Sequence, residues 1–243
     1  ATVVMSVVIA LFFALALDPL VRRLERYGLS RGRSMVVVFV GLGLVIGGLQ
    51  ANAFIVSANT EEGCTLFLVE ADTPGMLLRG LPLHDGSWAA ELTLDEVVGD
   101  EQCLLGQPGS GQPALRHGLA HATASLCAEL VGGMERAIEL SADYLKVRQQ
   151  FGVPIGSFQA LQHRIADMAA QLELSRSALF VLLDAIDNPE GQDLDLRVSQ
   201  VKVLVGRAAK YVCGQAIQLH GGMGTTEECS VGHYFKRDRK SGV

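Results

Sequence analysis

The sequence predicts an α+β fold with three parts, divided at 1–49, 50–105 and 113–243. A small antiparallel β segment precedes an up-down helical bundle, and an apolar helical hairpin precedes both. Three observations predict this. From residue 113 onwards, apolar residues recur at steps of three, four or seven. Short β-type runs at close spacing fill the middle part. Residues 1–17 and 34–60 contain no charged side chain.

The first part reads as two apolar runs around a basic link. The runs at 3–17 and 35–49 are just shorter than the ~20 residues that an untilted helix needs to cross a bilayer. We therefore expect a hairpin of two apolar helices that makes membrane contact through 1–49. A buried helix followed by a buried strand remains an alternative, because a valine-rich run fits either structure by pattern alone.

The link between the runs is rich in arginine, as membrane proteins are on the cytoplasmic side. Its five arginines are Arg22, Arg23, Arg26, Arg31 and Arg33. The stretch FFALALDPLVRRLERYGLSRGR, at 12–33, resembles the amino-terminal region of the AI-2E family of bacterial membrane permeases. This resemblance is confined to the first part of the chain.

The middle part contains three strand candidates, at 53–58, 64–69 and 89–94. Turn-like residues at 59–63 separate the first two, and Thr73-Pro74-Gly75 forms another turn. Short strands at this spacing predict a small antiparallel sheet or part of a barrel.

The last part is predicted to be helical, with apolar stripes over 115–145, 158–186 and 198–212. The sequence NPEG at 188–191 ends the second stripe. Long helices with short connections imply an up-down bundle. A fourth helix would complete the bundle, but the sequence offers little room for one after Arg237.

Two motifs in the helical part combine polar, aromatic and glycine residues. The first, RQQFGVPIGSFQ at 148–159, joins two helices through a tight turn. The second, QLHGGMG at 218–224, follows the third helix, where bare glycine backbone lets N–H groups approach a phosphate or a ring. A simple helix C-cap is the alternative function of these glycines.

Together the two motifs resemble the acyl-CoA dehydrogenase family, and the similarity extends over about 50–237. The β-type sequences AFIVSA and LFLVEADTPG occur in the order found in the middle β-domain of that family. The resemblance implies a flavoprotein whose FAD lies between subunits, with the two motifs binding its ADP half across a dimer interface.

By this resemblance, six residues are predicted to bind FAD. Arg148 would pair with the pyrophosphate, which suits a guanidinium fork. Gln150 would hydrogen-bond nearby, and Phe151 would pack against the adenosine. Gln218, Gly221 and Gly222 would contact the adenine-side edge.

No catalytic residue and no metal ligand is predicted. The family abstracts a proton from an acyl-CoA with a carboxylate base. One family position for the base would fall beyond Val243, and another falls near Ala122, where no carboxylate stands. Glu227 and Glu228 follow the glycine motif but do not match a base position. His121, His163, His220 and His233 show no metal-binding spacing among themselves, which favours structural roles.

The sequence thus predicts an incomplete acyl-CoA dehydrogenase-like flavoprotein that is inactive on its own. Its expected partners are an acyl-CoA substrate and a homo-oligomer or a partner subunit that completes the flavin site. A net charge of −6 argues against a nucleic-acid partner. The expected location is the cytoplasm, with membrane association through 1–49. Two alternatives stay open: a membrane-anchored interaction module, and an accidental fusion without a selected function.

Overall fold

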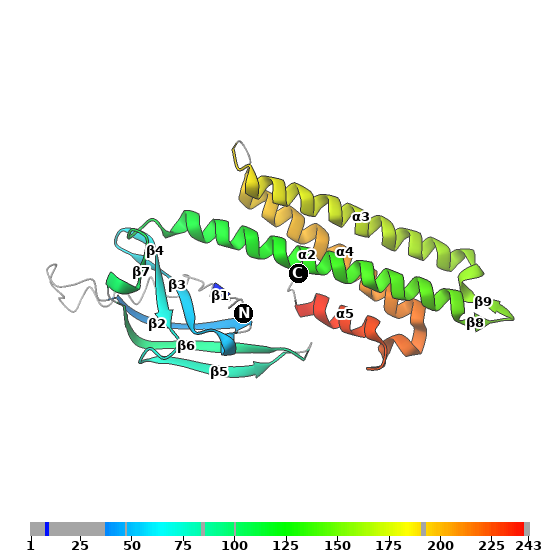
Figure 1. The fold of residues 1–243 in the computed structure, drawn as a ribbon, viewed down its shortest axis with the longest axis horizontal. Helices are drawn as coiled ribbons and strands as arrows, with labels where there is room; N and C mark the ends of the chain where they lie inside the picture. Colours follow the sequence, from blue (N-terminus) through cyan, green and yellow to red (C-terminus); the bar gives the residue numbers. More distant parts are fainter. Residues whose placement is uncertain are drawn as a thin grey trace, which may run out of the picture. The chain divides into compact units, whose positions relative to one another are not determined.

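A computed structural model describes residues 8–9, 37–46, 48–83, 86–99, 101–190 and 193–240. The chain divides into two compact units, Ala1–Leu115 and Arg116–Val243. The first is built mainly from strands and the second from helices (Figure 1).

The first unit contains two sheets. One has the strand order β1-β3-β4-β7 and the other β2-β6-β5. Their strands are β1 (Val8–Ile9), β2 (Val37–Ile46), β3 (Ala53–Thr60), β4 (Gly63–Glu70), β5 (Met76–Pro82), β6 (Trp88–Gly99) and β7 (Leu104–Leu105). All pairs are antiparallel except β1 with β3. This confirms the predicted small antiparallel β segment, whose strand candidates correspond to β3, β4 and β6.

One apolar core joins the two sheets of this unit. Phe54 from β3 and Phe67 from β4 pack in the same cluster as Leu92 and Leu94 from β6. Along β6, buried and less buried side chains alternate, as expected for a strand with one face in the core. The pattern breaks at Glu96, which has a φ of 52° beside a register shift between β2 and β6.

Strand β2 corrects the predicted helical hairpin. Residues 37–46, in the second apolar run, form a strand that pairs with β6 from Val37↔Gly99 to Ile46↔Ala89. Five of its ten residues are Val or Ile, which favour strands, and two are glycines, which weaken a helix. The segment therefore shares a sheet with residues of the predicted 50–105 part.

The first apolar run and the basic link lie outside the described residues, apart from Val8–Ile9. The permease resemblance at 12–33 therefore stays a prediction. Within the described part of the chain, no helix is long and apolar enough to cross a membrane.

The second unit is a bundle of α2 (Gly111–Val147), α3 (Gln159–Asp187), α4 (Leu194–His220) and α5 (Ser230–Lys240). The three long helices run in alternating directions, as the apolar stripes predicted (Figure 1). Their buried faces meet in one core that includes Met134, Met168, Leu182 and Val205. The fourth helix is present, although only a short one, and its Val231 is buried in the same core.

We predict that Cys127 resists alkylation in the folded protein. Its thiol is free and buried in the bundle, and burial raises its pKa, with Lys202 opposing the shift. The thiolate is the reactive form, so the raised pKa slows alkylation, and burial also keeps the reagent away from the sulfur. Mass spectrometry after a short iodoacetamide pulse should show label on the half-buried Cys64 and Cys229 but not on Cys127. Label on Cys127 at the same rate as on Cys64, without denaturant, would contradict this packing.

Candidate flavin-binding site

The first motif folds as a small β-hairpin between α2 and α3. Strands β8 (Gln149–Gln150) and β9 (Val153–Pro154) pair antiparallel. Phe151 and Gly152 form the two-residue turn, with φ values of 55° and 79°. Positive φ at both central residues is the signature of a type I′ turn, whose twist matches that of the flanking strands.

Arg148 is fixed by its backbone at the base of this hairpin. Its N–H donates to the carbonyl of Tyr144 at 2.9 Å, which extends the last turn of α2. Its carbonyl accepts a hydrogen bond from the N–H of Ile155 at 2.8 Å. The Arg148 side chain is exposed. A held backbone and an exposed guanidinium suit the recognition of an anion in solution.

Phe151 projects from the tip of the hairpin and is 91% exposed. It makes an edge-to-face contact with Phe158, with ring centroids 6.1 Å apart. An aromatic residue in the left-handed region is uncommon and costs free energy. The turn therefore presents an aromatic ring to solvent at an energetic cost, which is typical of a ligand-contacting position.

The cost of this turn can be measured with two substitutions at one position. Phe151→Asn and Phe151→Val both remove the ring contact, but asparagine tolerates a positive φ and valine does not. We expect the valine variant to have a free energy of unfolding about 1–2 kcal/mol lower than the asparagine variant. Urea unfolding without flavin measures the difference. Equal stabilities would mean that residue 151 is not left-handed.

The second motif caps α4. Gly221 ends the helix with a φ of 61°, and its N–H donates to the carbonyl of Gln218. Gly221 and Gly222 are exposed, and a Cβ at either would meet no atom within 4 Å. A short 3₁₀ helix, Gly221–Thr225, follows. The glycines thus form the C-cap of α4 and also leave an exposed backbone surface.

Tyr144 connects the two motifs. Its ring stacks on His220, the last residue of α4, with centroids 4.5 Å apart and an angle of 23°. Its hydroxyl lies 3.9 Å from the sulfur of Met223. His220 is buried, and its Nδ1 donates to the carbonyl of Ala216 at 2.8 Å. Tyr144 stands one helical turn before Arg148, so the ends of α2 and α4 are held together.

The six predicted residues therefore lie in two segments at the end of the bundle where α2 and α4 finish (Figure 1). All six are exposed: Arg148, Gln150, Phe151, Gln218, Gly221 and Gly222. Sequence reasoning missed Tyr144, although its spacing of four residues from Arg148 puts it on the same helix face.

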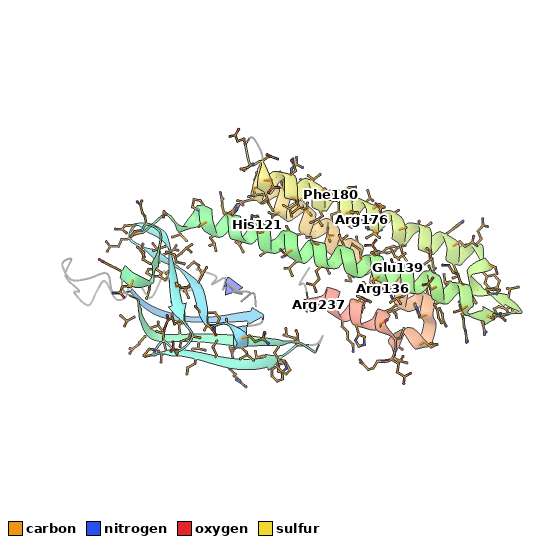
Figure 2. All side chains as sticks on the ribbon, in the orientation of Figure 1. His121, Arg136, Glu139, Arg176, Phe180 and Arg237 are labelled. Atoms are coloured by element: carbon orange, nitrogen blue, oxygen red, sulfur yellow. The ribbon has the colours of Figure 1, made fainter. Side chains whose placement is uncertain are left out.

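Two carboxylates of the helical unit, Glu129 and Glu227, take part in ion pairs. On α2, Ala122 is exposed. The next carboxylate, Glu129, forms an ion pair with Arg237 of α5, which is labelled in Figure 2. Glu227 pairs with Lys236. Residue 122 is alanine, so the first bundle helix has no carboxylate at the position that the family resemblance indicates.

Comparison with known proteins places this geometry in a family. Residues 109–240 match the family described as "Acyl-CoA dehydrogenase, C-terminal domain". The chain is 35% identical over 168 residues to "Probable acyl-CoA dehydrogenase YngJ" of Bacillus subtilis (strain 168), covering 68% of this chain and 43% of that protein. It is 34% identical over 202 residues to a mitochondrial 2-methylacyl-CoA dehydrogenase of Solanum tuberosum, covering 79% of this chain and 48% of that protein.

The fold agrees with this relationship. The structure of a glutaryl-coenzyme A dehydrogenase in complex with glutaryl-CoA superposes with a TM-score of 0.77 and 27% identity, covering 85% of this chain and 54% of that one. The chain belongs to the acyl-CoA dehydrogenase family. It spans about half the length of the curated relatives that it matches.

Proposed function

We propose that this chain binds the ADP half of FAD through the two motifs, as part of an acyl-CoA dehydrogenase. The observation that carries the proposal is the Tyr144–His220 stack, which holds an exposed guanidinium and a bare glycine pair at one end of the bundle. The membership of the family supports the same assignment.

The residues present fit this part of the cofactor. Arg148 would bind the pyrophosphate, because its planar fork can donate two parallel hydrogen bonds to phosphate oxygens. Gly222 leaves open space where a side chain would block a ring or phosphate. Phe151 would cover the adenosine and lose its large exposure to water.

Gln150 and Gln218 would supply further polar contacts. The Nε2 of Gln150 donates to the carbonyl of Gln149 at 2.8 Å, which leaves its side-chain oxygen to accept from a ligand. Gln218 is exposed beside the glycines and can both donate and accept. Bound FAD would supply the redox chemistry, by accepting a hydride from the substrate.

The proposed substrate class is an acyl-CoA thioester. The family and the glutaryl-CoA complex of a structural relative support this class. The completed site would contain a second subunit, either another copy or a different chain. Exposed apolar side chains on α3 support such an association. Leu174 is 57% exposed, and Phe180, which is labelled in Figure 2, is 64% exposed.

We predict that residues 1–243, supplied only with FAD, do not oxidise acyl-CoA. The reason is that alanine stands at residue 122, the base position that the family resemblance indicates on the first bundle helix, and alanine cannot accept the α-proton. The test is dye reduction with FAD and a panel of straight and branched acyl-CoA substrates. The expected rate equals that of FAD without protein, while flavin binding is retained. Substrate-dependent dye reduction that disappears on omitting the protein would contradict the prediction.

The alternative of a membrane-anchored interaction module is not favoured. It requires two apolar helices in residues 1–49, and residues 37–46 instead form β2, paired with β6. A cytoplasmic location remains part of our proposal.

A further inference from the structure

Two histidines on α2 lie together far along the helix from the flavin motifs. His117 and His121 are both exposed and one helical turn apart. Their Nε2 atoms are 3.0 Å apart, and their rings meet edge to face with centroids 4.5 Å apart. His121 is labelled on α2 in Figure 2. The histidines considered from sequence did not include His117, and its inclusion gives the spacing His-x-x-x-His.

The two nitrogens lie within hydrogen-bond distance of each other. At this distance the N–H of one ring can donate a hydrogen bond to the lone pair of the other. Replacing the shared proton by a metal ion would let both lone pairs bind at once, because neutral imidazole is a common metal ligand.

The separation is a hydrogen-bond distance, and it is also close to the spacing of two imidazole nitrogens that bind one metal ion. Metal–imidazole distances are about 2.0–2.1 Å, so two ligands at a right angle stand about 3.0 Å apart, whereas tetrahedral ligands stand about 3.4 Å apart. The observed 3.0 Å therefore matches right-angled coordination. Tetragonal or square-planar nitrogen coordination is typical of Cu²⁺ and Ni²⁺.

We propose that His117 and His121 form a two-imidazole binding site for a divalent transition-metal ion, with Cu²⁺ and Ni²⁺ preferred over Zn²⁺. Within the described part of the chain, no group of three or more His, Cys, Asp or Glu side chains could hold a metal. Water would therefore fill the other coordination positions, and the site is open to exchange. The nearby cation Arg116 is paired with Asp195 at 2.8 Å, which reduces its repulsion of an incoming metal ion.

A bound ion would bridge two successive turns of α2. Because the ion binds the folded helix and bridges the same ligands poorly in the unfolded chain, it stabilises the fold by mass action. This binding does not depend on flavin or on the proposed dehydrogenase function.

Calorimetric titration of the full chain with Ni²⁺ tests the proposal. We expect one site in the unsubstituted protein and loss of that site in both His117→Asn and His121→Asn. The matched control is His163→Asn, which removes another exposed helical histidine and should leave binding unchanged. Circular dichroism verifies that each variant is folded.

Electron paramagnetic resonance of the Cu²⁺ complex gives an independent reading. Coupling to two imidazole nitrogens is expected in the unsubstituted protein, and coupling to fewer than two in each single variant. Unchanged Ni²⁺ binding in His117→Asn and His121→Asn would overturn the proposal. A Cu²⁺ signal with thiolate ligands in place of imidazole would do the same.

Discussion

Arg148→Ala is expected to weaken FAD binding by about tenfold to a hundredfold. A hydrogen bond to a charged group contributes about 1.5–3 kcal/mol, and each 1.4 kcal/mol is a factor of about ten in affinity. The backbone of Arg148 supplies both hydrogen bonds that fix the hairpin base, and alanine retains them. The variant should therefore fold normally and differ only in affinity. Quenching of flavin fluorescence during titration measures the dissociation constant.

Arg197→Ala is the matched control for this prediction. Arg197 is also an exposed arginine of the bundle, but it lies near the start of α4, while the glycine motif follows its end. Its guanidinium contacts Gln200 of the same helix. FAD affinity should be unchanged in this variant. Equal losses in Arg148→Ala and Arg197→Ala would indicate a general charge effect and remove the specific role of Arg148.

Tyr144→Ala is expected to weaken flavin binding and to destabilise the bundle. The aromatic stack on His220 contributes about 0.5–1.5 kcal/mol beyond burial, so we expect the free energy of unfolding to fall by about 1–2 kcal/mol. Because Tyr144 does not belong to either motif, lower FAD affinity would show that the motifs must be held together. Urea unfolding and flavin titration measure the two effects.

Tyr144→Phe distinguishes the contribution of the aromatic stack from that of the hydroxyl. It keeps the ring on His220 and removes only the long contact to Met223. Both stability and flavin affinity should stay close to those of the unsubstituted protein. If Tyr144→Phe lowered stability and flavin affinity as much as Tyr144→Ala, the effect would belong to the hydroxyl, and the stacking role would be contradicted.

The bundle could be predicted from the spacing of its apolar residues, because each long helix buries one continuous apolar stripe. Met134 on α2, Leu182 on α3 and Val205 on α4 all lie on these stripes or within their ranges, and all are fully buried. Helix α5 escaped prediction for the opposite reason. Its last five residues are all charged, and Val231 is its one fully buried apolar residue among those described.

The strands show where local patterns fail. Strand β5 contains glycine and proline and no β-branched residue, so it has no strand signal of its own. It pairs with β6 along its whole length, and tertiary pairing therefore decides its structure. Strand β2 has β propensity, but its unbroken apolar character equally suggests a membrane helix. Its pairing with β6 joins residues far apart in the chain, and a local sequence pattern cannot predict such a contact.

The candidate site was only partly accessible from the sequence. The family resemblance selected Arg148, Phe151 and Gly221, and the structure shows how their backbones are held. The stack of Tyr144 on His220 could not be predicted, since it depends on how α2 packs against α4. The left-handed conformation of Phe151 was equally hidden, because its residue type disfavours it.

The most direct measurement is the visible absorption spectrum of the purified chain after incubation with FAD and removal of free flavin by gel filtration. We expect a flavin spectrum to co-elute with an oligomer of the chain. We expect Arg148→Ala to elute at the same position without that spectrum. An unsubstituted protein that is folded and emerges without flavin would contradict the assignment of Arg148 and the Gly221–Gly222 pair as a flavin-binding site.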